Sequence, residues 1–213
     1  MKTYVYKLTS DRGGAPCAPP PCDGQIPLLT LSICKPAIRR TAGVGDRLLG
    51  ITSRALAQRE GYPLHAVIYA ARVTGTLDFG SYYEPEGAYR QRPDCIYQLD
   101  PEDGTLRHTG ATRLHAEPAY LARDVGREPH FRNARTLLCE EFRYFGAEAV
   151  VIPARFPLLL HMAEAIGQGH RVYDQRSAES HELDRLFTTL WKRSTRYTPE
   201  RVEEEAPGHA PRP

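Results

Sequence analysis

Short segments in which hydrophobic and polar residues alternate dominate the first two thirds of the chain. Such alternation is typical of β-strands, because successive side chains of a strand point to opposite faces of the sheet. The pattern predicts strands at residues 2–9, 28–33, 47–52, 65–74, 96–99, 105–108, 136–142 and 147–152. The run at 65–74 is rich in β-branched and aromatic residues and lacks glycine and proline, which predicts a central strand.

The hydrophobic pattern changes to a helical period near the C-terminus. One helix is predicted at 157–166, where Gly167 and Gly169 end it. A second is predicted at 178–192, where apolar residues share one stripe: Leu183, Leu186, Phe187, Leu190 and Trp191. Strands followed by helices indicate an α+β fold, a small curved β-sheet or partial β-barrel with the C-terminal helices packed on it. By analogy, such a small barrel is PUA/ASCH-like.

Three segments lack a dependable period. Residues 10–27 contain five prolines and three glycines, which predicts a long loop. Residues 77–89 are rich in tyrosine and are expected to hold a short helix. Residues 109–133 show no usable pattern, and we expect irregular structure there.

The composition is that of a globular protein with one core. The 213 residues include 41% hydrophobic and 25% charged residues, so we expect one domain at 1–194 and an acidic, proline-rich, flexible tail at 195–213. No apolar run reaches the ~18–20 residues of a membrane helix, and no secretory signal precedes the first strand. Five cysteines without a C-x-x-C pair suit reduced thiols, so a cytoplasmic protein without a membrane partner is expected.

Basic residues cluster after the second predicted strand. The segment reads Cys34-Lys35-Pro36-Ala37-Ile38-Arg39-Arg40. Guanidinium groups bond phosphate oxygens in pairs and an ammonium adds a point charge, so Lys35, Arg39 and Arg40 are candidates for binding phosphate. A solvated basic turn above a buried Cys34 is the other interpretation. The net charge of +2 is too small to indicate a protein that coats nucleic acid.

Aromatic and acidic residues supply candidates for reading a nucleobase. Tyr144 and Phe145 are candidates for stacking on a base, and packing in the core is the alternative. Asp11 and Asp94 are candidates for accepting a hydrogen bond from an exocyclic amine or for acting as a general base. Both aspartates also suit turns and helix caps, which is the more frequent use.

Metal and cofactor chemistry is not indicated by the motifs. Cys17, Cys22 and Cys34 have the wrong spacing for a zinc ribbon and lack a nearby fourth ligand, so we expect no metal and no cofactor. Cys34 is a candidate nucleophile that needs a histidine base, and the spacing does not select one among eight histidines. The nucleophile-elbow, P-loop, dinucleotide and H-E-x-x-H motifs are absent from the sequence.

The order of these motifs resembles nucleotide modification associated domain 2. The resemblance covers about residues 1–192 and rests on Tyr4-x-Tyr6-x-x-Thr9-x-Asp11-x-Gly13, Cys34-Lys35-Pro36-x-Ile38-Arg39-Arg40, Gly45-Asp46, Pro93-Asp94-x-Ile96-Tyr97, Phe142-x-Tyr144-Phe145-Gly146 and Gly169-His170. It implies a small prokaryotic or phage protein linked to systems that modify nucleotides in DNA. The chain departs from the pattern in its longer proline-rich loop around 17–22.

Three hypotheses for function follow. The favoured one is a module that binds a modified nucleotide or nucleobase, free or in nucleic acid, through Lys35, Arg39, Arg40, Asp46, Asp94, Tyr144 and Phe145. The alternative is an enzyme that modifies or hydrolyses a nucleotide, with Cys34 as nucleophile, Asp11 as base and Lys35 as electrostatic stabiliser. The third is a structural or interaction protein that uses the terminal helix and the tail.

Overall fold

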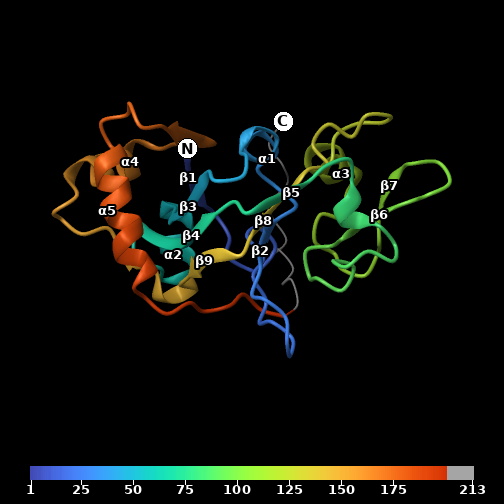
Figure 1. Cartoon of the computed structure of the whole chain (residues 1–213), viewed down its shortest axis with the longest axis horizontal. Helices are drawn as coiled ribbons and strands as arrows, with labels where there is room; N and C mark the ends of the chain where they lie inside the picture. Colours follow the sequence, from blue (N-terminus) through green and yellow to red (C-terminus); the bar gives the residue numbers. More distant parts are fainter. Residues whose placement is uncertain (201–213) are drawn as a thin grey trace. The chain divides into compact units, whose positions relative to one another are not determined.

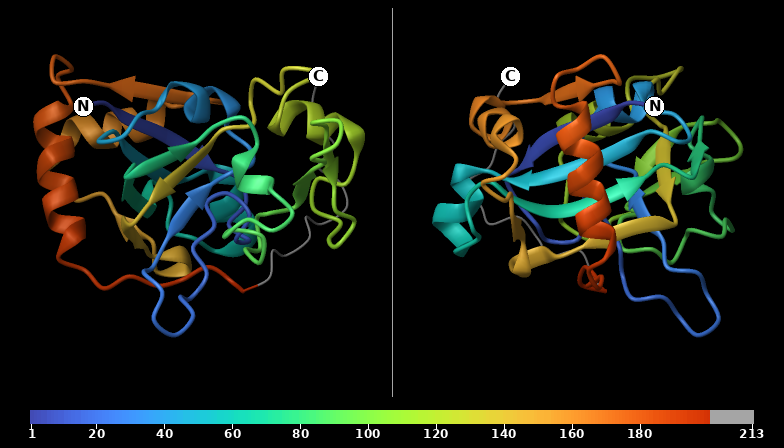
Figure 2. Two further views of the ribbon diagram at one scale, coloured as in Figure 1. Left: turned by 45° about the vertical axis from the view of Figure 1, so that its right-hand side comes forward. Right: turned by 60° about the vertical axis from the view of Figure 1, so that its left-hand side comes forward.

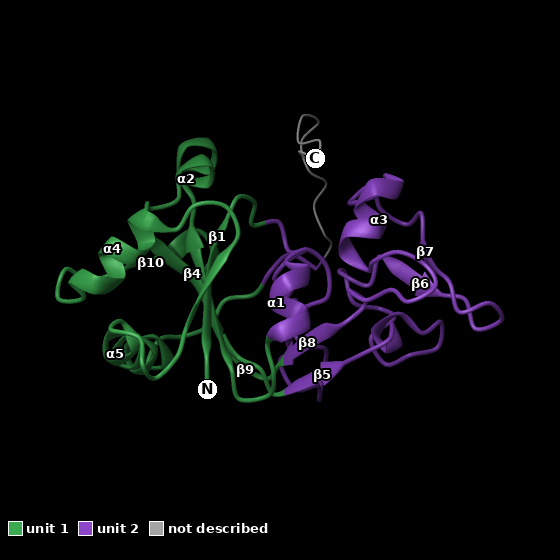
Figure 3. Cartoon of the chain, turned by 90° about the horizontal axis from the view of Figure 1, so that it is seen from above, with its two compact units in different colours: residues 1–11, 42–74, 139–197 green, residues 12–41, 75–138, 198–213 purple. Residues whose placement is uncertain are grey.

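Two compact units make up the part of the chain that the computed structural model describes, residues 1–200. Unit 1 comprises residues 1–11, 42–74 and 139–197. Unit 2 comprises residues 12–41 and 75–138 together with the segment that starts at Thr198 (Figure 3). The chain therefore passes between the units several times, and neither unit is a continuous stretch of sequence.

A mixed six-stranded sheet forms the centre of unit 1. Its strands are β1 (Thr3–Leu8), β3 (Arg47–Thr52), β4 (Ala66–Arg72), β9 (Glu141–Tyr144), β10 (Val150–Val151) and β11 (His170–Tyr173). The order is β10-β4-β3-β1-β11, and β9 also pairs with β4. Strands β1 and β3 are parallel, and the remaining pairs are antiparallel. The predicted central strand is thus β4, which has three neighbours in the sheet.

Helices cover the sheet of unit 1. Helix α4 (Pro157–Ala165) and helix α5 (Ser180–Trp191) lie beside its strands in Figure 2 and share one hydrophobic core with β1, β3 and β4. The predicted stripe on α5 is confirmed, because Leu183, Leu186, Phe187 and Leu190 are buried in this core and Trp191 packs against it. Unit 1 also contains helix α2 (Arg54–Glu60) and the short 3₁₀ turn η2 (Gly146–Glu148).

Unit 2 is built from short elements joined by long loops. Strands β2 (Leu29–Leu31), β8 (Thr136–Cys139) and β5 (Gly75–Leu77) form one sheet in that order, and β6 (Tyr97–Leu99) pairs with β7 (Leu106–His108) as the predicted hairpin. Helix α1 (Pro36–Thr41), helix α3 (Pro118–Asp124) and the turn η1 (Ser81–Tyr83) complete the unit (Figure 1). Its core is rich in buried tyrosine, with Tyr82, Tyr83 and Tyr97 in edge-to-face contact.

The α+β class is confirmed, and several details of the predicted elements are corrected. Residues 1–200 form small sheets with no closed barrel. The stretch at 109–133 is not irregular throughout, because it contains α3. The predicted strand at 136–142 is two strands, β8 and β9. Helices α1 and α2 and strand β11 were not predicted, since each is short and carries a weak period.

The first residues of the predicted tail, 195–213, make hydrogen bonds with other parts of the chain. The Arg196 backbone N–H donates to the Tyr144 carbonyl at 2.6 Å, and Thr198 is buried and donates its backbone N–H to the Ala18 carbonyl. The rest of the predicted tail, 201–213, lies outside the described residues. Within residues 1–200, no helix has the length and apolar content to cross a membrane.

Candidate functional site

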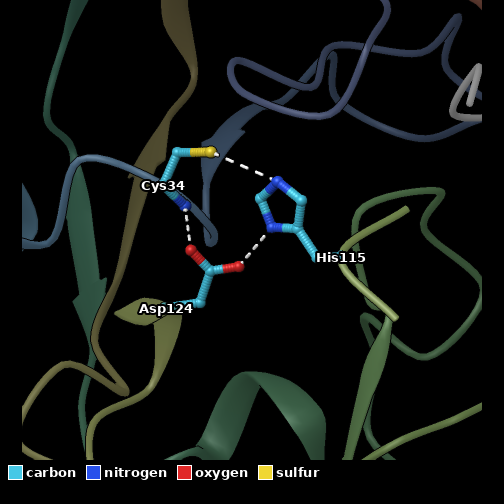
Figure 4. Close-up of side chains that lie close together, drawn as sticks. All are labelled: Cys34, His115 and Asp124. Carbon is cyan, nitrogen blue, oxygen red and sulfur yellow. Dashed lines mark hydrogen bonds and ion pairs between the residues drawn. The ribbon is translucent and has the colours of Figure 1, made fainter. Parts of the chain in front are cut away.

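A cysteine, a histidine and an aspartate of unit 2 form a hydrogen-bonded chain (Figure 4). The Cys34 Sγ lies 3.8 Å from His115 Nε2. The other ring nitrogen, His115 Nδ1, lies 2.5 Å from Asp124 Oδ2. A thiol, an imidazole base and a carboxylate that orients the imidazole are the groups that nucleophilic cysteine catalysis requires in that order.

Cys34 lies between β2 and α1, on a turn with unusual backbone geometry. Cys34 and Lys35 both have positive φ, at 53° and 43°. Non-glycine residues avoid this region at a cost of about 1–3 kcal/mol each, so surrounding contacts must hold the turn. A nucleophile on a strained strand-to-helix turn projects its side chain away from the strand, as in nucleophile elbows. Cys34 is partly buried, whereas three of the other four cysteines are fully buried.

Asp124, the last residue of α3, is held by three donors. The Cys34 backbone N–H donates to Asp124 Oδ1 at 2.8 Å, and the Tyr97 hydroxyl donates to Oδ2 at 2.9 Å. His115 Nδ1 donates to the same Oδ2. Asp124 is 1% exposed, so these donors replace water around the carboxylate and fix its orientation.

His115 is buried, and its ring contacts the Tyr120 ring, the Cys34 sulfur and the Asp124 carboxylate. Its ring stacks on Tyr120 with 4.3 Å between centroids and 12° between planes. Burial lowers the pKa of His115. Hydrogen bonds and electrostatic interactions with Asp124 and Cys34 outweigh burial and raise the pKa to about 10. The raised pKa of His115 therefore favours an imidazolium at neutral pH, with the buried Asp124 carboxylate as its partner.

Arg39 joins the segments that carry the three residues. Its side chain is fully buried, and its guanidinium donates to four backbone carbonyls: Cys34 at 2.7 Å, Asp124 at 2.5 Å, Asn133 at 2.5 Å and Arg135 at 2.7 Å. Two of these carbonyls belong to site residues. This geometry favours a structural role for Arg39 over the predicted phosphate contact, because its donors are used inside the protein.

Lys35 adds positive charge beside the thiol. The side chain is half-buried, and burial lowers the pKa of Lys35, an effect that Arg123 reinforces and Cys34 opposes. An ammonium in this place stabilises negative charge on the sulfur or on a bound anion.

The same three residues are also the one group within residues 1–200 whose donor atoms could hold a metal ion. Their ligand atoms all lie within 4.8 Å of one another. The arrangement fits a metal less well than a proton relay, because His115 turns one nitrogen to the carboxylate and the other to the sulfur. A metal bound by all three residues needs sulfur, carboxylate oxygen and one ring nitrogen around a common point.

Two other predicted residues of unit 2 lie in different surroundings. Arg40 is exposed and donates to Asn133 Oδ1 at 2.7 Å. Asp94 is fully buried and accepts hydrogen bonds from the hydroxyls of Thr30, Ser32 and Tyr82. Every one of these bonds joins segments of the unit 2 core. The surroundings of Asp94 favour a structural network over contact with a base.

Asp11 and Tyr144 belong to unit 1 and contact each other. The hydroxyls of Tyr144 and Tyr62 donate to Asp11 Oδ2 at 2.9 and 3.1 Å. Burial raises the pKa of Asp11 to about 6, against the two tyrosine hydrogen bonds that lower it. The structure therefore brings Asp11 together with a predicted stacking residue, in a different unit from Cys34 and Lys35.

The remaining predicted residues, Asp46 and Phe145, also lie in unit 1. The Asp46 carboxylate accepts from the Lys2 and Gly43 backbone nitrogens, which stabilises the turn before β3. Phe145 is 5% exposed and belongs to the core beneath α4 and α5. These contacts are those of a turn and a core residue.

The sequence missed His115 and Asp124, although it marked Cys34. Both residues lie in 109–133, the stretch expected to be irregular. A signal was present, because Pro118 follows an acidic residue and opens α3, as proline does at the first position of a helix. Asp124 ends that helix, nine residues after His115. Neither signal shows which histidine reaches the cysteine.

The family of the chain follows from comparison with known families. The model of nucleotide modification associated domain 2 matches residues 1–206. The chain belongs to this family. No curated protein and no solved structure matches the chain. The matched range contains all three residues of the Cys34–His115–Asp124 site.

Proposed function

We propose that this member of the nucleotide modification associated domain 2 family is an enzyme of a nucleotide-modification system, with Cys34 as a covalent nucleophile. The supporting observation is the chain from Cys34 Sγ through His115 to Asp124. The family name supports a role in nucleotide modification. The proposal keeps Cys34 as the predicted nucleophile and replaces Asp11 with His115 as the base.

The proposed substrate is a modified nucleotide, free or within nucleic acid, that carries an acyl group on nitrogen or oxygen. In the reactive state the thiol proton is on His115 Nε2, and the sulfur bonds to the acyl carbon. His115 then gives that proton to the leaving nitrogen or oxygen as its bond to carbon breaks. Water attacks the thioester and His115 accepts its proton. Breaking of the carbon–sulfur bond then releases the acyl group as a carboxylic acid and restores the sulfur beside protonated His115.

Other groups of unit 2 have supporting roles in this proposal. Asp124 orients the ring of His115 and stabilises the imidazolium that forms, as carboxylates do in related triads. Lys35 and Arg40 bind a phosphate of the substrate, which retains part of the predicted basic cluster. The five free cysteines agree with a reducing compartment, and we place the protein in the cytoplasm.

Incubation of the full chain with a pool of modified nucleosides and oligonucleotides, followed by mass spectrometry, tests the proposal. We expect conversion that Cys34→Ala abolishes and that His115→Ala reduces by about a thousandfold. Cys22→Ala is the matched control, because Cys22 is a free and exposed cysteine away from this site. A covalent mass adduct on Cys34 in the wild type further supports the proposal.

Two results would contradict a thiol nucleophile. Tight binding of a modified nucleotide without conversion or adduct would favour the binding module that the sequence indicated, including a PUA-like mode of base recognition. Activity lost on chelation and restored by Zn²⁺ would instead favour metal chemistry at the same residues.

A further inference from the structure

A second basic site lies in unit 1, outside every motif marked in the sequence. A hollow of about 220 Å³ is lined by Arg155, Phe156, Arg185, Thr188 and Thr189. Arg155 lies just before α4, and the other basic residue, Arg185, lies on α5. The hollow therefore sits where these two helices meet, and both helices are anchored in the same core.

The two guanidinium groups share one aromatic ring. The Arg155 guanidinium carbon lies 5.0 Å from the centre of the Phe156 ring, and that of Arg185 lies 5.4 Å from it. Phe156 is 1% exposed, so its position is fixed by the core. A buried ring beneath two cations holds their planes in place through cation–π attraction. It also excludes base stacking on Phe156, because the ring is covered.

Neither guanidinium has a carboxylate partner within residues 1–200. The nearest acidic residues on α5 are committed elsewhere, since Asp184 pairs with Arg47 at 2.7 Å and Glu182 accepts from the Leu159 backbone nitrogen at 3.1 Å. Two like charges that line one hollow repel each other in a folded protein. An anion that lies between them relieves this repulsion and receives several N–H donors at once.

The hydroxyls of the hollow do not supply further donors. Thr188 and Thr189 donate to the backbone carbonyls of Asp184 and Arg185, each at 2.9 Å. Thr188, Thr189 and Phe156 therefore line the hollow without a free donor, and the arginines supply its charge. A tetrahedral anion with several oxygens fits two guanidinium forks better than a planar carboxylate, which one fork already satisfies.

We propose that Arg155 and Arg185 bind the phosphate group of a nucleotide or of single-stranded nucleic acid. This site shares no residue with the Cys34–His115–Asp124 site, and binding there does not require the thiol. It gives unit 1 a binding function of its own, which holds whether or not unit 2 catalyses a reaction.

Calorimetric titration of the full chain with inorganic phosphate, with thymidine 5′-monophosphate and with a 20-nucleotide oligothymidine tests this site. We expect the double change Arg155→Gln and Arg185→Gln to weaken binding at least tenfold for the probe that binds. Arg176→Gln is the matched control, since Arg176 is exposed and lies outside the hollow. The double change Arg155→Lys and Arg185→Lys keeps the positive charge but loses the guanidinium forks. Its affinity should lie between that of the wild type and that of the glutamine double variant.

The probes distinguish the two sources of phosphate. Equal effects on the mononucleotide and the oligonucleotide assign a free nucleotide. An effect on the oligonucleotide alone, with a salt slope reduced by about one to two in log–log form, assigns a nucleic-acid backbone. The proposal is overturned if the glutamine double variant binds all three probes as tightly as the wild type does. Cys34→Ala tests the proposed reaction and the glutamine double variant tests this site, so failure here and failure of the proposed reaction are separate outcomes.

Discussion

The carboxylate of Asp124 contacts the backbone of Cys34 and the ring of His115 at the same time. One oxygen accepts the backbone N–H of Cys34 at 2.8 Å, and the other accepts His115 Nδ1 at 2.5 Å. The aspartate thus links the backbone of the cysteine to the ring that faces its sulfur. Displacement of Asp124 is therefore expected to change the position of the nucleophile as well as the state of its base.

The reactivity of Cys34 should depend on His115 in a way that disappears at high pH. At pH 7 the imidazolium stabilises the thiolate, so we expect His115→Ala to slow alkylation of Cys34 by iodoacetamide at least tenfold. Because the pKa of His115 is about 10, the imidazolium is lost as the pH rises through that value. The rates of wild type and variant should then converge above pH 10.

Peptide mass spectrometry measures this alkylation, and exposed Cys22 supplies an internal reference in the same sample. The alkylation rate of Cys22 should be the same in the wild type and in His115→Ala at every pH. A ratio of wild-type to variant rates that stays constant between pH 6 and 11 would show that His115 does not act on the sulfur.

Tyr97→Phe isolates the second donor to Asp124 without removing the ring from the core. The lost hydroxyl donates to Oδ2 at 2.9 Å, and a hydrogen bond to a charged group is worth about 1.5–3 kcal/mol. The carboxylate then interacts more strongly with the imidazolium, so the pKa of His115 should rise above that of the wild type. The pH at which the alkylation rates converge should move upward by the same amount.

A histidine-selective NMR titration checks this shift directly. Tyr83→Phe is a suitable control, because Tyr83 is a buried tyrosine whose hydroxyl donates to the Ser32 carbonyl and not to the site. A titration of His115 that Tyr97→Phe leaves unmoved would remove Tyr97 from the positioning of Asp124.

How much of the structure can be predicted from the sequence depends on how far apart along the chain the interacting residues are. Strand alternation is local, so β1, β3 and β4 were predicted within two residues of their ends. The stripe on α5 is local too, and its burial is confirmed. The short helices α1 and α3 carry little hydrophobic period of their own. Contacts with distant parts of the chain stabilise them, and such contacts cannot be predicted from a local pattern.

The candidate site shows the same limit more sharply. Cys34 and Asp124 are 90 positions apart, and no spacing rule connects them. The basic cluster was visible, but the burial of Arg39 was not, because three of the four carbonyls that it contacts belong to distant segments. A guanidinium that satisfies backbone carbonyls has the same sequence signature as one that binds phosphate.

Asp11→Asn is expected to stabilise unit 1 at neutral pH. Burial raises the pKa of Asp11 to about 6 from a usual 3.8, so the aspartate adds stability below pH 3.8 that is lost as the pH rises through 6. Among the described residues, Oδ1 is buried without a hydrogen-bond partner. Asparagine keeps an oxygen for both tyrosines and removes the charge, a gain of roughly 1–2 kcal/mol at pH 7.

Denaturant unfolding at several pH values measures this effect. The gain should shrink from pH 7 to pH 4, and Glu164→Gln on the exposed face of α4 should show no such trend. Loss of stability in Asp11→Asn at pH 7 would contradict the prediction that the ionised carboxylate destabilises the folded protein.

Gly50 is the position in β3 where a side chain has no room. A Cβ atom there would lie 2.2 Å from Tyr69 Cε1 and 2.6 Å from Leu8 Cδ1, both in neighbouring strands. Tyr69 cannot move freely, since its hydroxyl bonds that of Tyr6 at 2.5 Å inside the core. Gly50→Ala should therefore destabilise the protein by about 2–3 kcal/mol, near the upper range for overpacked cores.

Thermal and denaturant unfolding of Gly50→Ala measure this cost, and Gly167→Ala is the control because nothing lies within 4 Å of its Cβ position. The alkylation rate of Cys34 is a second readout, since the strain falls on the sheet of unit 1. A stable Gly50→Ala protein would mean that β3 and β4 can separate at the register shift between Gly50 and Ile51. Because that shift already interrupts the ladder, the backbone beside Gly50 is where such a movement would begin.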